Sequence, residues 1–305
     1  MLLEELKSEF ILDCQIRNLS KRTVETYELN ISLFLRWLEK EMKVNELSPL
    51  NKNHFKMYVV HLQREQYQAS YINLLMKCLK SFFNYLVEEE YVSVNYPKQI
   101  KVLKEEQKVI DTFSDKQVKE LIRYYNKTDY LSVRNKLIVM LFVDTGIRCT
   151  ELRQIKTDFV FANYIKLHGK GNKWRVVPIS SSLQKQLLKY ERMKNTYFTS
   201  RQITIKDDTL LLTRSGEKIK SNVAIEKIIG DASIGIEGVS DIRCSPHTLR
   251  HYFAKTSIKN GQDIFTLSKL LGHSNIKITQ RYLESMNSDE IVEKGLRTSP
   301  LSLNY

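Results

Sequence analysis

The chain has 305 residues, of which 42% are hydrophobic and 27% charged, a composition typical of globular proteins and unlike that of disordered chains. Its formal net charge of +13 favours a polyanionic partner, although a soluble basic protein without such a partner would carry the same charge. Residues 1–100 hold 13 basic and 13 acidic side chains, so the whole excess lies in residues 101–305. Affinity for phosphate should therefore depend mainly on the later part of the chain.

Three further features of the sequence concern where the protein works. The longest fully apolar run, Leu137 to Val143, is too short to span a membrane. The start of the chain lacks the basic residues of a signal peptide. No two of the four cysteines have the spacing of a zinc site or a redox motif. We therefore expect a cytoplasmic protein with free thiols, no bound metal and no membrane partner.

The first hundred residues are expected to form helices throughout. Apolar residues recur at helical spacing in four stretches, residues 3–11, 27–38, 55–62 and 72–86. Ser20 is a candidate N-cap for the second helix and Ser70 for the fourth. Because short helices are rarely stable alone, we predict a helical bundle domain over residues 1–95.

Residues 96–112 interrupt the helical pattern. The segment contains Pro97 and several lysines, so we predict an interdomain linker with an extended backbone. A solvated surface loop is the ordinary alternative, and a basic linker that wraps a DNA duplex is the functional one. A second domain is predicted over residues 113–305.

The second domain is expected to combine helices with a β-hairpin. An apolar helix over Leu131–Val143 ends at Gly146, since glycine commonly terminates helices. Two strands, Tyr164–His168 and Trp174–Pro178, flank a turn that contains glycine. Leu210–Thr213 is a candidate short strand. Further helices are expected near residues 221–230, 246–259, 263–271 and 275–283. The predicted fold class is thus mainly α with a small β-sheet.

Several polar residues of the second domain are suited to handling a phosphate, although each has an ordinary structural alternative. Arg148 and Glu151 lie three residues apart, as in a surface ion pair. Lys170 lies between two glycines at the hairpin tip, where it could protonate a leaving oxygen or simply belong to the turn. His247 and Arg250 share one face near a helix start, where anions are favoured, but a capped surface helix has the same pattern.

Two residues further along complete the set. His273 follows the helix-ending sequence Leu-Leu-Gly, where it could also be a boundary histidine. Tyr282 could attack phosphorus and hold it covalently, although most of the sixteen tyrosines should be packing residues. His251 is expected to point away from the site. In this order and spacing, the residues predict phosphodiester cleavage through a phosphotyrosine.

The same residues lie in motifs that resemble those of the tyrosine recombinase (phage integrase) family. The matching segments are residues 145–152 around the first arginine, 169–178 around the hairpin lysine, 247–254 with the pattern H-x-L-R-H, 271–274 with L-G-H, and 279–282 at the nucleophile. Residues 20–27 resemble the first stretch of the family's core-binding domain, so the resemblance spans nearly the whole chain. Departures are minor: Ile147 replaces the usual leucine, Thr150 replaces serine, and Leu283-Glu284 replace Thr-His. In size the chain resembles bacterial Xer proteins and short mobile-element integrases.

The resemblance implies both an architecture and a set of roles. It implies a SAM-like core-DNA-binding domain over residues 1–95 and a mixed α/β catalytic domain with a C-terminal tail over residues 113–305. The implied catalytic residues, supported by Glu151, are Arg148, Lys170, His247, Arg250, His273 and Tyr282. Tyr282 forms a 3′-phosphotyrosyl bond, the two arginines stabilise the charge on phosphorus, Lys170 is the general acid, His247 is the candidate base and His273 donates to a phosphate oxygen. No cofactor or metal is required.

The implied partners are double-stranded DNA with inverted-repeat core sites and further subunits, four of them on two duplexes, alone or with a second related recombinase. Tail residues Ile291, Val292 and Leu296 are expected to pack on a neighbouring subunit. Candidate DNA contacts are Lys21, Arg22, Lys77, Lys80, Lys173 and Arg175. Two alternatives stay open, a type IB topoisomerase and a catalytically silent DNA-binding accessory protein. The sequence does not distinguish chromosome-dimer resolution from integration or excision of a mobile element.

Overall fold

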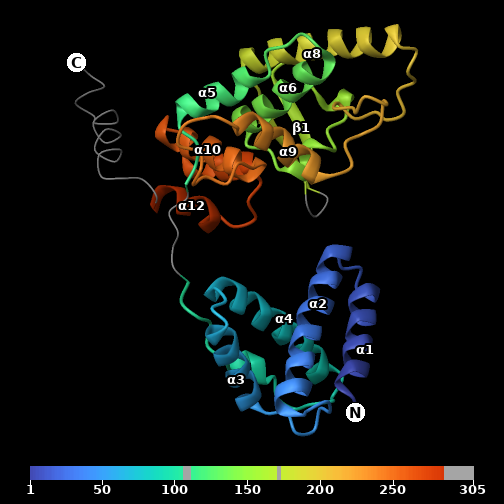
Figure 1. Cartoon of the computed structure of the whole chain (residues 1–305), viewed down its shortest axis with the longest axis vertical. Coiled ribbons are helices and arrows are strands. Elements are labelled where there is room, and N and C mark those ends of the chain that lie inside the picture. Colours follow the sequence, from blue (N-terminus) through green and yellow to red (C-terminus); the bar gives the residue numbers. More distant parts are fainter. Residues whose placement is uncertain (106–110, 170–172, 285–305) are drawn as a thin grey trace, which may run out of the picture. The chain divides into compact units, whose positions relative to one another are not determined.

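The structure, a computed structural model, describes residues 1–105, 111–169 and 173–284. The chain divides into two compact units, Met1–Lys108 and Val109–Tyr305 (Figure 1). The described residues are mostly helical, and their named strands form a two-stranded sheet. The predicted fold class, mainly α with a small β-sheet, is therefore confirmed. No helix within the described ranges is both long and apolar enough to cross a bilayer.

The first unit is a bundle of helices around an aromatic core. Its α-helices are α1 (Leu3–Ile16), α2 (Lys21–Trp37), α3 (Lys52–Arg64) and α4 (Ala69–Glu88), and the π-helical turn η1 (Leu38–Met42) extends α2. Ser20 caps α2 as predicted, because its hydroxyl accepts the Thr23 amide at 3.2 Å. The prediction of Ser70 as a cap is wrong, since α4 already begins at Ala69, a strong helix former. The buried rings of this core include Phe10, Phe34, Phe55, Phe82 and Phe83.

Part of the segment predicted as a linker is folded onto the first unit. Residues Tyr96–Gln99 form a 3-10 turn, η2, and Ile100 and Leu103 pack against the aromatic core. The Asn73 side chain donates to the Leu103 carbonyl at 3.0 Å and accepts the Leu103 amide at 2.9 Å. The expectation of an extended backbone is therefore wrong for Tyr96–Gln99, and the segment packs on the first unit because burying its apolar side chains is favourable.

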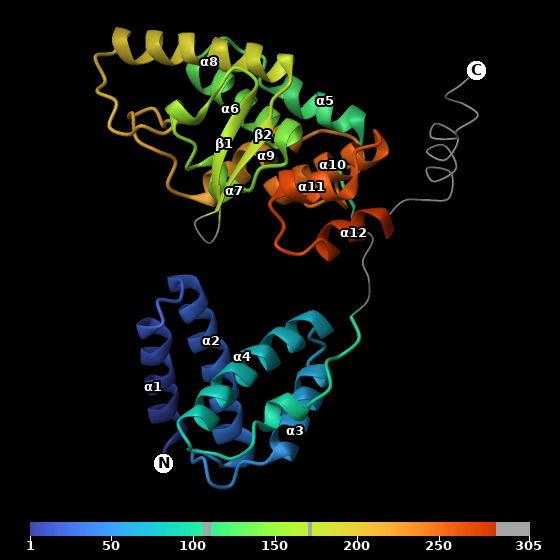
Figure 2. The same ribbon diagram turned by 180° about the vertical axis from the view of Figure 1, so that it is seen from behind.

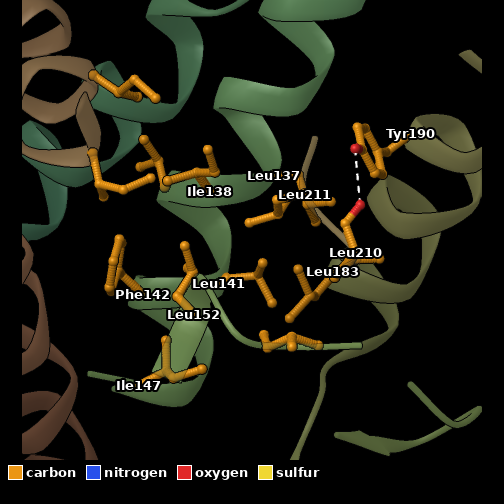
Figure 3. Packing of buried hydrophobic residues seen from close by; sticks show 14 of the residues in the cluster. Leu137, Ile138, Leu141, Phe142, Ile147, Leu152, Leu183, Tyr190, Leu210 and Leu211 are labelled. Carbon is orange, nitrogen blue, oxygen red and sulfur yellow. Dashed lines mark hydrogen bonds between the residues drawn. The ribbon is translucent and has the colours of Figure 1, made fainter. Parts of the chain in front are cut away.

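The second unit is built around α6 (Tyr130–Thr145). Figure 3 shows Leu137, Ile138 and Leu141 of this helix among buried residues from other elements, as predicted for the apolar run. The Tyr190 hydroxyl donates to the Leu210 carbonyl at 2.9 Å. The surrounding elements are α5 (Asp115–Tyr124), η3 (Thr157–Phe159), α8 (Ser181–Ser200) and α9 (Asn222–Ser233). The strand predicted over Leu210–Thr213 is wrong, since this segment makes only an isolated bridge from Leu212.

The two strands of the hairpin lie where the sequence predicted them. Strands β1 (Tyr164–Gly169) and β2 (Lys173–Pro178) pair antiparallel, with His168 opposite Trp174 and Leu167 opposite Arg175. Lys170, the residue predicted at the tip, lies outside the described residues.

Short elements gather near the hairpin at one end of the second unit. They are α7 (Cys149–Leu152), α10 (Pro246–Lys259), α11 (Ile264–Leu271) and α12 (Lys277–Glu284). Helix α11 contacts β2, α10 and α12, and α7 contacts β1 (Figure 2). Helix α11 is thereby brought against a strand that lies at least 86 residues earlier in the sequence.

Candidate active site

Glu151 is buried at the end of α7 and binds two arginines. Its Oε1 lies 2.9 Å from Nη1 of Arg148. Arg175 donates through both terminal nitrogens, Nη1 to Oε1 at 2.5 Å and Nη2 to Oε2 at 2.8 Å. The Glu151 side chain is only 4% exposed and that of Arg148 is 36% exposed, so the pair joins a buried carboxylate to a half-buried guanidinium. Burial raises the pKa of Glu151, but the hydrogen bonds and charges of the two arginines outweigh burial and hold this pKa below its ordinary value.

Arg250 on α10 is buried against backbone carbonyls. Its Nη1 donates to the Gly146 carbonyl at 2.6 Å, and its Nη2 donates to the Leu271 carbonyl at 2.7 Å. Burial, followed by the charges of Arg148 and Arg175, lowers the pKa of Arg250 to about 9. The side chain therefore stays charged at neutral pH, and among the described residues no ion pair neutralises it. An anion placed beside this guanidinium would be strongly favoured.

The last two carbonyls of α11 and that of the following Gly272 accept hydrogen bonds from all three arginines. Arg175 Nε donates to the Leu270 carbonyl at 2.8 Å, and Arg148 Nη2 donates to the Gly272 carbonyl at 2.6 Å. Together with the bond from Arg250 to Leu271, three successive carbonyls each accept one guanidinium. Carbonyls at a helix C-terminus lack intrahelical donors and carry partial negative charge, so they suit cations.

Gly272 makes this arrangement possible. It ends α11 with φ +64°, a left-handed conformation that favours glycine. A Cβ at this position would lie 3.1 Å from Cδ of Arg175 and 3.2 Å from Nη1 of Arg148. A side chain at residue 272 would therefore crowd both arginines and displace them by a few tenths of an ångström.

Tyr282 on α12 is hydrogen-bonded to a histidine that was expected to point away. The Tyr282 hydroxyl lies 2.7 Å from Nδ1 of His251, and the tyrosine is only 3% exposed. The prediction for His251 was wrong because His247 and His251 are four residues apart on α10 and so lie on one helix face. Their ring centroids are 4.1 Å apart. The i, i+4 spacing was the signal in the sequence that could have identified His251.

His273 lies directly after the Gly272 turn. Its Nδ1 lies 2.8 Å from the Thr279 hydroxyl, and its backbone N–H donates to the Ser268 carbonyl at 3.1 Å. Burial, then the charges of the three arginines, lower the pKa of His273 to about 4. Burial, then His247 and Arg250, lower the pKa of His251 to about 4 as well. Both rings are therefore neutral at neutral pH, and Nδ1 of a neutral His251 can accept a hydrogen bond from the phenol.

These depressed pKa values predict how stability depends on pH. In the unfolded chain both histidines titrate near pH 6.5. Between pH 6.5 and pH 4 the unfolded state binds protons that the folded state does not, so the free energy of unfolding falls by roughly 2–3 kcal/mol per histidine. Urea denaturation of the full chain at several pH values measures this loss. The His251→Gln variant should show a flatter profile than the unaltered chain, and equal profiles would contradict the assignment.

The predicted DNA contacts lie in different surroundings. Lys21, Arg22 and Lys77 are exposed on α2 and α4, and Lys80 is half-buried on α4. The side chain of Lys173 lies outside the described residues. Arg175 is 11% exposed and its guanidinium binds Glu151, so it lies beside the predicted catalytic residues, and its contact with DNA stays a prediction. The cysteines are free thiols, as expected.

We call one set of side chains the active-site cluster: Arg148, Glu151, Arg175, Arg250, His251, His273 and Tyr282. Of the predicted catalytic residues, the structure brings Arg148, Arg250, His273 and Tyr282 together around the end of α11. His247 lies beside His251 and is itself exposed. The cluster offers guanidinium donors and a phenol beside a neutral imidazole, which is what cleavage of a phosphodiester by a tyrosine needs.

Comparison with known proteins agrees with this chemistry. The model of the Phage integrase family matches residues 111–288, and that of the phage integrase N-terminal SAM-like domain matches residues 6–92. Tyrosine recombinase XerC of Anoxybacillus flavithermus is 28% identical over 269 residues, covering 87% of this chain and 88% of that protein. Tyrosine recombinase XerD of Staphylococcus haemolyticus is 26% identical over 283 residues, covering 92% and 94%.

Solved structures share the fold at lower identity. XerH recombinase bound to palindromic difH substrate aligns with a TM-score of 0.70 and 19% identity, covering 95% of this chain and 84% of that one. A lambda integrase dimer bound to a COC′ core site aligns with a TM-score of 0.70 and 16% identity, covering 91% and 97%. The chain belongs to the phage integrase family and is a tyrosine recombinase of the Xer type.

Proposed function

We propose that this recombinase cuts and rejoins DNA at specific sites through a covalent bond between Tyr282 and a 3′-phosphate. The observation that carries the proposal is the convergence of Arg148, Arg250 and Tyr282 on the end of α11. The arginines bind non-bridging oxygens of the scissile phosphate and stabilise the extra negative charge of the transition state. The phenol displaces a 5′-hydroxyl, and a later attack by a 5′-hydroxyl reverses the bond, so the energy of the phosphodiester is conserved.

We assign the proton transfers as follows. His251 accepts the phenolic proton, because it contacts the Tyr282 hydroxyl directly whereas His247 reaches the tyrosine only through the His251 ring. His273 donates from Nε2 to a phosphate oxygen while Thr279 orients the ring through Nδ1. The role of Lys170 as the acid for the leaving 5′ oxygen rests on the resemblance to the family.

The DNA partner follows from the same site and from the charge of the chain. We assign residues 1–95 to a core-DNA-binding domain, 96–112 to the connection and 113–305 to the catalytic domain, which carries the whole basic excess. Four subunits on two duplexes with inverted-repeat core sites are the proposed assembly. Solved relatives support this choice, since XerH is bound to a palindromic substrate and lambda integrase is a dimer on a core site.

Covalent capture across a genome tests the proposal. The purified chain is incubated with genomic DNA of its source, the reaction is stopped with detergent, and the DNA attached to protein is sequenced. We expect a few discrete sites with a blocked 3′ end and a free 5′-hydroxyl. Adducts without sequence preference, together with relaxation of supercoiled plasmid, would favour a topoisomerase, and no adducts would favour a silent accessory protein. A duplex of the captured site, nicked so that cleavage becomes irreversible, then serves as suicide substrate.

Gly272→Ala should lower the rate of covalent capture on this substrate about 10- to 100-fold. The left-handed backbone costs an alanine roughly 1 kcal/mol, and the new methyl group displaces the side chains of Arg148 and Arg175 by a few tenths of an ångström or more. Gly230→Ala is the matched control, because this helical glycine has open space around its Cα and no positive φ. The control should keep the full rate and become slightly more stable. Equal rates for the two variants would refute the placement of Gly272.

A further inference from the structure

The side of the β-hairpin that faces away from the core carries a half-exposed tryptophan. Side chains alternate along both strands, so Ile165, Leu167 and Val177 are buried while their neighbours lie on the opposite side. We call this opposite side the hairpin outer face, formed by Lys166, His168, Trp174 and Val176. Trp174 is 47% exposed and Val176 is 54% exposed, although both are apolar.

The Trp174 ring is held in place by its neighbours. The Phe159 ring meets it edge-on at a centroid distance of 5.1 Å, and the His168 ring lies 4.8 Å away. The Lys166 ammonium lies 4.7 Å from the indole centroid, within the range of a cation–π contact. An aromatic ring that is already oriented loses little conformational entropy when a second flat group stacks on it.

The position of the hairpin outer face next to the active-site cluster favours DNA as its partner. Trp174 is followed by Arg175, whose guanidinium binds Glu151 in the active-site cluster, so adjacent residues of β2 serve opposite faces of one strand. Trp174 and Arg175 are consecutive residues, so the outer face begins one residue away from a side chain of the active-site cluster, on the other side of the strand. The four residues of this face include a cationic lysine and no carboxylate. An aromatic platform beside a cation is the arrangement that binds nucleotides by stacking and by phosphate contact.

We propose that the hairpin outer face binds the DNA next to the scissile phosphate, with Trp174 stacked on a base that becomes unpaired during strand exchange. Lys166 contacts a phosphate of the same strand. The proposal rests on the proposed function, since it places the cut strand at the active-site cluster. Stacking would hold the freed end in the site until the strands are rejoined.

Fluorescence provides a direct test, because the chain contains two tryptophans and Trp37 is only 8% exposed. In the Trp37→Phe variant the emission comes from Trp174 alone. We compare the suicide substrate with the same duplex carrying three unpaired bases beside the nick. We expect both duplexes to quench the Trp174 emission and to protect this tryptophan from acrylamide. Both effects should be larger with the duplex that carries unpaired bases. Unchanged emission and unchanged acrylamide access, while anisotropy of labelled DNA reports saturated binding, would overturn the proposal.

The DNA affinity of variants, and the number of subunits that sediment with the DNA, provide a second test. Trp174→Ala should weaken binding to the duplex with unpaired bases about five- to hundredfold, whereas Trp174→Phe should restore most of the affinity. Tyr124→Ala removes an equally exposed ring (51%) from α5 and should change nothing. If Trp174→Ala leaves DNA affinity intact but lowers the number of subunits sedimenting with the DNA, the face binds protein and the proposal is wrong. Failure of the proposed function is recognised separately, because the unaltered chain would then form no covalent adduct.

Discussion

Tyr282→Phe should abolish covalent attachment to the suicide substrate while DNA affinity stays within about twofold of that of the unaltered chain. The substitution removes the attacking oxygen and leaves the ring, which packs against Ala254, Leu267 and Leu271. Loss of the hydrogen bond to His251 costs about 1 kcal/mol of stability, too little to unfold the unit. Denaturing gels that separate protein–DNA adducts measure attachment, and labelled duplex measures affinity.

The matched control for this variant is Tyr252→Phe. The Tyr252 hydroxyl donates to Asp115 at 2.7 Å, so this variant also loses a hydroxyl and its hydrogen bond from the same unit. It should form adducts at the normal rate. Any attachment by Tyr282→Phe would mean that another residue is the nucleophile, and equal loss in both variants would mean that the hydroxyl of Tyr282 has only a structural role.

Arg250→Lys should slow covalent capture about 10²- to 10³-fold, with little change in DNA affinity. A lysine ammonium cannot reach the Gly146 and Leu271 carbonyls together and cannot fork onto two phosphate oxygens. Its charge would also be harder to keep, because burial and the neighbouring arginines already lower the pKa of Arg250 to about 9. Single-turnover rates on the suicide substrate at pH 7 give the effect directly.

Arg192→Lys, an exposed substitution on α8, controls for the chemical change alone. The melting temperature of both variants shows whether loss of activity follows loss of folding. A rate for Arg250→Lys within threefold of the unaltered chain, in a folded protein, would exclude a bidentate role for Arg250 in the transition state. Recovery of that rate at lower pH would instead show that only the charge of the side chain matters.

Local patterns in the sequence predicted most of the elements. The apolar run ending at Val143 could only be a core helix, the spacing of glycines and β-branched residues marked the hairpin, and Ser20 was recognisable as a cap. The arginines and Tyr282 were predicted from motif order, and the structure brings them together. Each of these predictions depended on residues close in sequence or on an arrangement repeated across a family.

Two features that the sequence did not predict involve contacts between distant segments. Arg175 follows the alternation of its strand, but no local pattern shows that Leu270, 95 residues later at the end of α11, places its carbonyl beside the guanidinium. Leu103 was predicted to belong to the linker, because the sequence around it does not show that it binds Asn73, thirty residues away. His251 is different, since helical periodicity alone would have placed it on the face of His247.

The use of main-chain oxygens to hold the guanidinium groups affects how the protein tolerates evolutionary change. The carbonyls of residues 270 and 271 stay in place after any side-chain replacement that preserves the helix. Substitutions at these two positions therefore leave the acceptors for Arg175 and Arg250 unchanged. Residue 272 in the turn is the position most sensitive to substitution, because a single added Cβ would crowd the side chains of Arg148 and Arg175.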